Sequence, residues 1–152
     1  MNQGEVWIAR VPYSDVSDSI DSIANALIHS NKKKSKKRYV LVLGDVRPVL
    51  IISRDEYHKA SSNSSVIACP ITSNLQRAIK MYHTLKSAGF RGVTPDLLRI
   101  TGNERIQAGL DRDSAIVILK VTTLNVNQLE NKIGGLTDTK VSSVVEIVKE
   151  FF

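Results

Sequence analysis

The sequence has 152 residues, of which 42% are hydrophobic and 24% are charged, with a formal net charge of +6 and a pI near 9.6. This length suits one compact domain, and the composition excludes a mostly disordered chain. A single cysteine excludes an intramolecular disulfide, and no run approaches the roughly 18 apolar residues of a membrane span. We therefore expect a cytoplasmic protein with no membrane partner, whose basic charge favours an anionic partner, most commonly a nucleic acid.

The first predicted element is a strand at residues 5–11, where apolar and polar side chains alternate. From residue 15 to residue 30 the apolar residues recur every three or four positions, which predicts an amphipathic helix. We expect this helix to pack on the body of the protein. The same apolar stripe also fits a protein partner or a dimer mate.

A run of cationic residues follows this helix and contains no apolar member. It comprises Lys32, Lys33, Lys34, Lys36, Lys37 and Arg38. Such a run is exposed, and it either binds nucleic-acid phosphates or serves as a solvated linker.

Two buried strands are predicted in the middle of the chain. Residues 46–53 (VRPVLIIS) and 64–72 (SSVIACPIT) have the length and the β-branched content of strands covered on both faces. The apolar run at 39–43 is a candidate hairpin partner of the first of these strands.

Residues 74–89 favour a helix, with Leu75, Ile79 and Leu85 directed inward and Gly89 at its end. The sequence DLLRIT at 96–101 resembles a short strand. This part of the chain has the weakest periodicity.

Three elements are predicted in the last third of the sequence. The apolar stretch at 113–121 predicts a strand. Asn125 and Gly134 have the residue types that cap the start and the end of a short helix. Residues 138–152 predict a C-terminal amphipathic helix that packs in the core.

The sequence lacks the motifs of most metal-dependent and nucleotide-dependent enzymes. Its three histidines and its lone cysteine have no metal-ligand spacing, and it contains no GxxxxGK, GxGxxG or GxSxG motif. We therefore expect no metal site and no cofactor, and the sequence disfavours a serine hydrolase.

Polar residues at two strand ends are the remaining candidates for chemistry. Arg47 opens one predicted strand and Thr72 closes the next, and antiparallel neighbours bring such positions together. A guanidinium presents a rigid fork of donors that matches a phosphate, so Arg47 and the Thr72 hydroxyl would contact one phosphate group. The alternative, which spacing alone favours, is that Arg47 pairs with Asp45 or Asp55 at the surface while Thr72 satisfies a turn.

Five stretches resemble, in the same order, the motifs of the MazF/PemK toxins of type II toxin-antitoxin systems. They are GEVWIARV, RPVLIIS, VIACPITSN, GLDRDSAIVI and TTLNVNQLENKIGGL. The resemblance implies a mainly β fold with flanking helices, namely a small SH3-like (CcdB/PemK-like) β-barrel. It further implies one toxin domain over residues 1–152, with a family-atypical insertion at about 14–38 that adds a helix after the first strand, and with a C-terminal helix.

The resemblance also implies a function and its residues. Members form homodimers, bind an antitoxin protein and cleave single-stranded RNA, usually mRNA, without a metal, by attack of the 2′-hydroxyl to leave a 2′,3′-cyclic phosphate and a 5′-hydroxyl. The catalytic arginine and threonine of the family fall on Arg47 and Thr72, with Ser53 and Ser73 as supporting contacts. RNA contacts are expected from the cationic run at 32–38, and also from Asn74 and Arg77.

Two departures from the family pattern bear on activity. Leu119, Lys120 and Thr122 stand where members often have an acidic residue, a glutamine and an arginine, so the sequence does not identify a general base. The segment 76–99 is longer than usual and would cover or extend the RNA groove. The alternative function is a non-catalytic module on the same barrel that binds a nucleic acid or a protein such as a topoisomerase.

Overall fold

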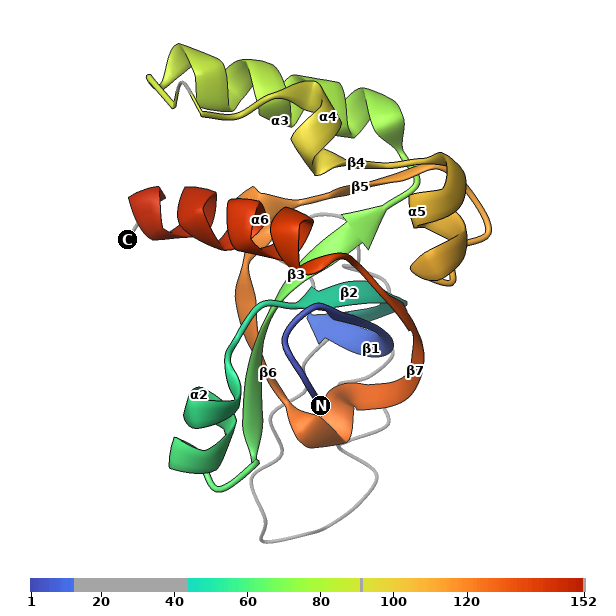
Figure 1. Cartoon of the computed structure of the whole chain (residues 1–152), viewed down its shortest axis with the longest axis vertical. Coiled ribbons are helices and arrows are strands. Elements are labelled where there is room, and N and C mark those ends of the chain that lie inside the picture. Colours follow the sequence, from blue (N-terminus) through green and yellow to red (C-terminus); the bar gives the residue numbers. More distant parts are fainter. Residues whose placement is uncertain (13–43, 91, 152) are drawn as a thin grey trace, which may run out of the picture.

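The computed structural model of the chain describes residues 1–12, 44–90 and 92–151 (Figure 1). The predicted helix at 15–30, the cationic run at 32–38 and the apolar run at 39–43 lie outside these residues. The insertion at about 14–38 therefore stays a prediction.

A curled antiparallel sheet forms the centre of the molecule (Figure 1). Its strands run in the order β4-β5-β3-β2-β1-β7, and β6 also pairs with β3. Every pairing is antiparallel. The strands are β1 (Glu5–Pro12), β2 (Gly44–Ile51), β3 (Ser65–Thr72), β4 (Arg99–Ile100), β5 (Ser114–Ile116), β6 (Thr122–Asn125) and β7 (Leu129–Gly135).

Helices flank the sheet. α3 and α4 lie at the end of the molecule opposite α2, where α3 contacts β5 and α4 contacts both β4 and α6 (Figure 1). The elements are α2 (Asp55–Ala60), α3 (Leu75–Ser87), α4 (Pro95–Leu98), α5 (Gly102–Gln107), α6 (Asp138–Phe151) and the two 3-10 turns η2 (Ile118–Lys120) and η3 (Val126–Gln128). The mainly β fold with flanking helices and a C-terminal helix is confirmed.

The predicted strands at 46–53 and 64–72 are confirmed as β2 and β3. Most of β3 and the last three residues of β2 are buried on both faces, because each face meets a different core. Val49 and Ile51 belong to an inner cluster with Val66 of β3. Leu50 belongs to a larger cluster that also contains Cys69 and residues of the flanking helices. Successive side chains of a strand point to opposite faces, so an unbroken apolar run is what a doubly covered strand requires.

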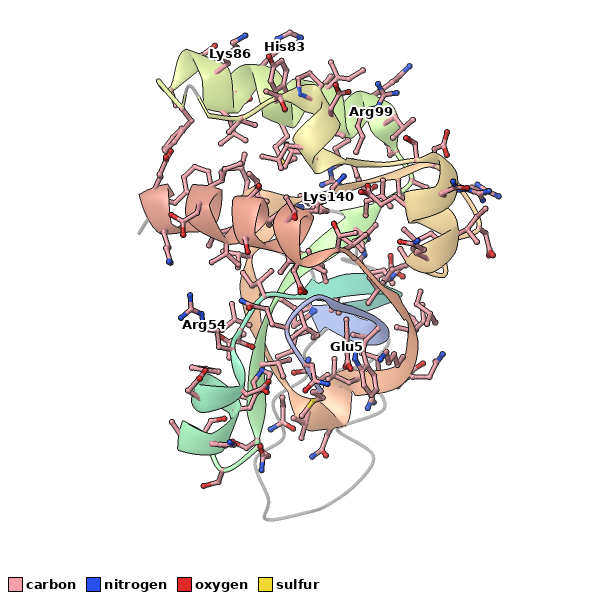
Figure 2. All side chains as sticks on the ribbon, viewed as in Figure 1. Glu5, Arg54, His83, Lys86, Arg99 and Lys140 are labelled. Atoms are coloured by element: carbon pink, nitrogen blue, oxygen red, sulfur yellow. The ribbon has the colours of Figure 1, made fainter. Side chains whose placement is uncertain are left out.

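The C-terminal helix α6 packs as its periodicity predicts. Val141, Val144 and Ile147 lie at three-residue spacing, and all three are buried. At the start of the helix, Lys140 Nζ donates to the backbone oxygen of Arg99 and forms an ion pair with Glu104. Lys140 thereby ties α6 to the segment that carries β4 and α5 (Figure 2).

The expected strand at 113–121 is wrong beyond Ile116. The chain leaves the extended conformation at Val117 and forms η2, so β5 and β6 are separate strands. β5 pairs with the end of β3 and β6 pairs with its start. The two short strands β5 and β6 can thus both pair with the curled strand β3, whereas one straight strand could not pair along its whole length. Leu119 and Lys120 consequently lie in η2 rather than in a strand.

The helix expected after Asn125 is also wrong beyond its first turn. Asn125 and Gln128 form the capping box that the sequence signals, but the helix stops after η3 and the chain continues as β7. Pairing with β1 overrides the local signal. Gly134 does not end a helix; a Cβ there would lie 2.3 Å from the backbone oxygen of Gln107, so glycine permits the close approach of α5.

The helix at 74–89 is confirmed as α3, which ends before Gly89. Its predicted inward face is partly wrong. Leu85 is buried together with Ala78 and Met81, whereas the Ile79 residue is 56% exposed. At 96–101 only residues 99 and 100 form a strand, because the preceding residues belong to α4.

Candidate active site

Arg47 and Thr72 lie on neighbouring strands whose register brings them into line. β2 and β3 pair Val49 with Pro70, and continuing this register by two positions sets Arg47 across from Thr72. Beyond the last pair each strand continues with another neighbour, β1 for Arg47 and β5 for Thr72. The two residues therefore stand where β2 and β3 begin to separate.

The two side chains also share one face of the sheet. Arg47 has the same parity along β2 as Val49 and Ile51, and Thr72 has the same parity along β3 as Ala68. Val49, Ile51 and Ala68 all belong to the inner cluster. Arg47 and Thr72 therefore extend the inner face at its polar edge, each held by a strand that is buried a few residues away.

Arg47 forms the ion pair that the surface alternative predicts. Its Nη2 donates to Oδ2 of Asp45 at 2.8 Å, and its side chain is 27% exposed. A guanidinium has five N–H donors, so this contact does not exhaust its capacity. Asp45 thus orients Arg47, and the remaining donors suit a planar or tetrahedral oxyanion.

Thr72 begins the turn that leads into α3. Its Oγ1 accepts a hydrogen bond from the backbone N–H of Asn74 at 3.1 Å, which leaves the hydroxyl proton available for donation to a ligand. Asn74 in turn caps α3, because its side-chain oxygen accepts from the Arg77 N–H at 3.2 Å. Ser73 and Arg77 are exposed beside this turn. The three predicted contact residues Ser73, Asn74 and Arg77 thus lie within five residues after Thr72.

Ser53 lies at the other end of β2 from Arg47, which corrects the expectation that it supports the same site. Ser53 is six positions after Arg47 and two positions beyond the end of β2, or about 20 Å away for an extended chain. Ser53 is only 6% exposed, and its Oγ accepts from the Ile67 N–H and forms a 2.6 Å hydrogen bond with Nε2 of His58. It serves as a structural contact.

Sequence reasoning missed that Ser53, His58 and Asp55 together contain the residue types of a hydrolase triad. Nδ1 of His58 lies 3.8 Å from Oδ1 of Asp55, and His58 is 3% exposed. Burial keeps a substrate from Ser53, so the group fastens α2 to the sheet. The only sequence signal was a histidine within a short polar stretch after a buried strand.

Glu5 is a second polar group that the sequence did not single out. Burial alone would raise the pKa of its carboxyl group, but hydrogen bonds from Trp7, Lys132 and Asn2 outweigh burial and lower the pKa to about 2. Trp7 Nε1 donates at 2.9 Å and Lys132 Nζ at 3.0 Å. The charged carboxylate joins β1 to β7, and both of its oxygens accept hydrogen bonds.

Within residues 1–12, 44–90 and 92–151, the structure contains no group of three or more His, Cys, Asp or Glu side chains that could hold a metal ion. Among the same residues, no helix has the length and apolar character needed to cross a membrane.

The family model of the PemK-like, MazF-like toxin of type II toxin-antitoxin systems matches residues 2–152. The endoribonuclease MazF of Staphylococcus saprophyticus is 31% identical over 101 residues, which cover 66% of this chain and 68% of that protein. A MazE-MazF structure and a MazF structure from Deinococcus radiodurans each match 99% of this chain and 94% of theirs, at 11% and 14% identity with TM-scores of 0.51 and 0.52. These two structures support the fold. The match over nearly the whole sequence shows that this chain belongs to the PemK-like, MazF-like toxin family of type II toxin-antitoxin systems.

Proposed function

We propose that this toxin is a metal-independent endoribonuclease that cleaves single-stranded RNA, with mRNA as the substrate, at a phosphate held by Arg47 and Thr72. The observation that carries the proposal is the placement of these two residues in line on one face of β2 and β3. A related protein named endoribonuclease MazF supports the reaction class.

In the proposed reaction the substrate supplies its own nucleophile. The 2′-oxygen attacks the adjacent phosphorus, the bond from phosphorus to the 5′-oxygen breaks, and the products carry a 2′,3′-cyclic phosphate and a 5′-hydroxyl. The proton of the 2′-hydroxyl passes to a water molecule, the departing 5′-oxygen takes a proton from Arg47, and Arg47 regains a proton from solvent. Arg47 stabilises the charge that develops on the phosphorane and serves as a proton donor to the departing oxygen, and Thr72 donates its hydroxyl proton to a non-bridging oxygen.

The protein contributes position and charge. β2 and β3 are anchored by buried residues on both faces, so the backbone at the site is fixed before RNA binds. α3 starts three residues after Thr72, and the positive end of its dipole adds to the favourable potential for an anion. Ser73, Asn74 and Arg77 are exposed and follow Thr72 at the start of α3, so we expect them to contact the RNA backbone next to the cleaved phosphate.

The test is cleavage of a long single-stranded RNA by the purified protein in EDTA, with analysis of the product ends. We expect cyclic-phosphate ends, and we expect Arg47→Ala to reduce the rate by about a thousandfold or more. Arg54→Ala is the matched control, because Arg54 is an exposed arginine just beyond the other end of β2. Intact RNA at high enzyme excess, with RNA still bound, would instead favour the non-catalytic module.

We further propose that the toxin is a cytoplasmic homodimer neutralised by an antitoxin protein. One similar structure is a MazE-MazF complex, which supports a protein partner for this fold. A short acidic reading frame immediately upstream of the gene would encode the candidate. Co-expression should yield a stable complex with suppressed RNA cleavage, and light scattering of the free toxin should give twice the mass of one chain.

A further inference from the structure

Helix α3 carries two apolar faces, and only one of them is buried in the core. Ala78, Met81 and Leu85 pack toward the body of the protein. A second row, Leu75, Ile79 and Tyr82, follows the i, i+4, i+7 spacing of one helix stripe. Because Ala78, Met81 and Leu85 are the residues of α3 that pack in the core, Ile79 of the second row stays exposed.

This second row forms one wall of a groove of about 340 Å³ between α3 and α4. Pro95 and Leu98 of α4 line the facing side. The groove is therefore apolar along its length, with an isoleucine side chain standing at its rim. An exposed apolar surface of this kind typically marks a contact with another molecule.

The polar rim of the groove is basic. His83 and Arg99 line it, and Lys86 is close by, with Nζ 3.0 Å from the Tyr82 hydroxyl and 5.4 Å from the centre of its ring. No lining residue among those described carries a carboxylate. Figure 2 shows His83, Lys86 and Arg99 at the end of the molecule that carries α3 and α4, far from Glu5.

We propose that this groove docks an acidic amphipathic segment of a partner protein. Apolar side chains of the segment enter between α3 and α4, and its carboxylates meet Arg99 at the rim and Lys86 beside it. A second copy of this chain fits poorly, because a symmetric contact would bring the same basic rim against itself. RNA also fits poorly, because the groove walls are mainly aliphatic and the Tyr82 ring already carries Lys86.

The groove is separate from the phosphate site but adjoins it. Leu75 follows Thr72 by three residues, so a segment in the groove would extend toward the proposed RNA path. Docking does not depend on RNA cleavage, and the two proposals can fail independently.

The test selects ligands for the 152-residue chain from a phage library of random 12-residue peptides. We expect enrichment of acidic peptides with bulky apolar residues three or four positions apart. Synthetic versions should bind Ile79→Ser at least tenfold more weakly than the wild type. Ile106→Ser is the matched control and should change affinity less than twofold, because Ile106 is a 65% exposed isoleucine on α5 that does not line the groove.

Charge reversal distinguishes electrostatic docking from non-specific hydrophobic binding. Arg99→Glu should weaken the acidic peptides at least fivefold, whereas Arg112→Glu, at an exposed arginine outside the groove, should not. Selection of peptides without acidic residues, or equal losses in both isoleucine variants, would overturn the proposal. So would Ile79→Ser if it weakened a 20-nucleotide single-stranded RNA instead, or if it dissociated a toxin dimer instead.

Discussion

The two ends of strand β2 both carry an arrangement of polar side chains that suggests catalysis, but they differ in access. Near the start, Arg47 and its partner Asp45 are in contact with solvent, on the strand next to the one that ends at Thr72. At the end, Ser53, His58 and Asp55 have the residue types of a hydrolase triad, yet the serine and the histidine are both buried. Residue type alone would favour the second end as an active site. Access favours the first.

Hydrogen-bond saturation distinguishes the two hydroxyls as well. The Ser53 oxygen accepts from a backbone N–H and also bonds to a histidine ring. The Thr72 oxygen has one contact given by the structure, from the Asn74 N–H. A group with unused donor capacity at the surface can bind a ligand, whereas a saturated buried group can only stabilise the fold.

After the loss of about a thousandfold or more expected for Arg47→Ala, the largest expected effect is on Thr72. Thr72→Val keeps the shape of the side chain and removes its hydroxyl, so we expect the rate of RNA cleavage to fall about a hundredfold, or about 2.7 kcal/mol of transition-state stabilisation. Because Ser53 is buried beyond the other end of β2, we expect no such loss for Ser53→Ala when the rate is calculated per folded molecule. Initial rates with a short labelled RNA would measure both variants, and equal rates for Thr72→Val and the wild type would exclude Thr72 from catalysis.

The next effect is on stability rather than activity. His58→Ala removes the partner of the Ser53 hydroxyl and leaves a buried space under α2, so we expect the free energy of unfolding to fall by about 2 kcal/mol. Urea unfolding followed by circular dichroism would measure it. Cleavage by the folded fraction should stay normal. A fully folded His58→Ala protein that no longer cleaves RNA would reverse the comparison and make this end of β2 the active one.

The sequence predicted correctly that Thr72 ends β3, because an apolar run followed by polar residues determines where a buried strand stops. Arg47 was expected to open its strand, but β2 begins three residues earlier, at Gly44, because pairing with β1 extends it. Ser53 was wrongly assigned to the site of Arg47 and Thr72. The sequence does not say which end of β2 lies next to Thr72. Only the register between β2 and β3 supplies that information.

The elements that were predicted wrongly depend on contacts distant in sequence. Asn125 and Gln128 carry a true capping signal, but a helix after them would forfeit the pairing of β7 with β1. The break at Val117 follows from the curl of β3, which no local pattern encodes. Ile79 has the spacing of a core residue because the row it belongs to is apolar, although no element of the described chain covers it.

A smaller loss of activity is expected at Asp45. Asp45→Asn removes the charge that holds the Arg47 guanidinium, so the arginine samples more rotamers and we expect kcat to fall about fivefold, or about 1 kcal/mol. Asp55→Asn is the control at the buried end of β2 and should leave kcat unchanged. A gain in RNA affinity with Asp45→Asn, at unchanged kcat, would show that Asp45 competes with the substrate instead of orienting Arg47.

The smallest effect concerns Glu5, a charged group that is saturated like Ser53. Its folded pKa of about 2 lies below the ordinary value of 4.5, so the folded state favours the ionised form. The stability gained from this preference is fully present above about pH 4.5, and it is lost as the pH falls toward 2. The Glu5→Gln variant has no carboxylate to ionise and lacks this stabilisation. We therefore expect it to be less stable than the wild type by about 1 kcal/mol at pH 7, with the difference shrinking toward pH 2. Thermal unfolding of both proteins at pH 7, 4 and 2.5 would measure the convergence, and a difference independent of pH would show that shape at Glu5, rather than charge, holds β1 to β7.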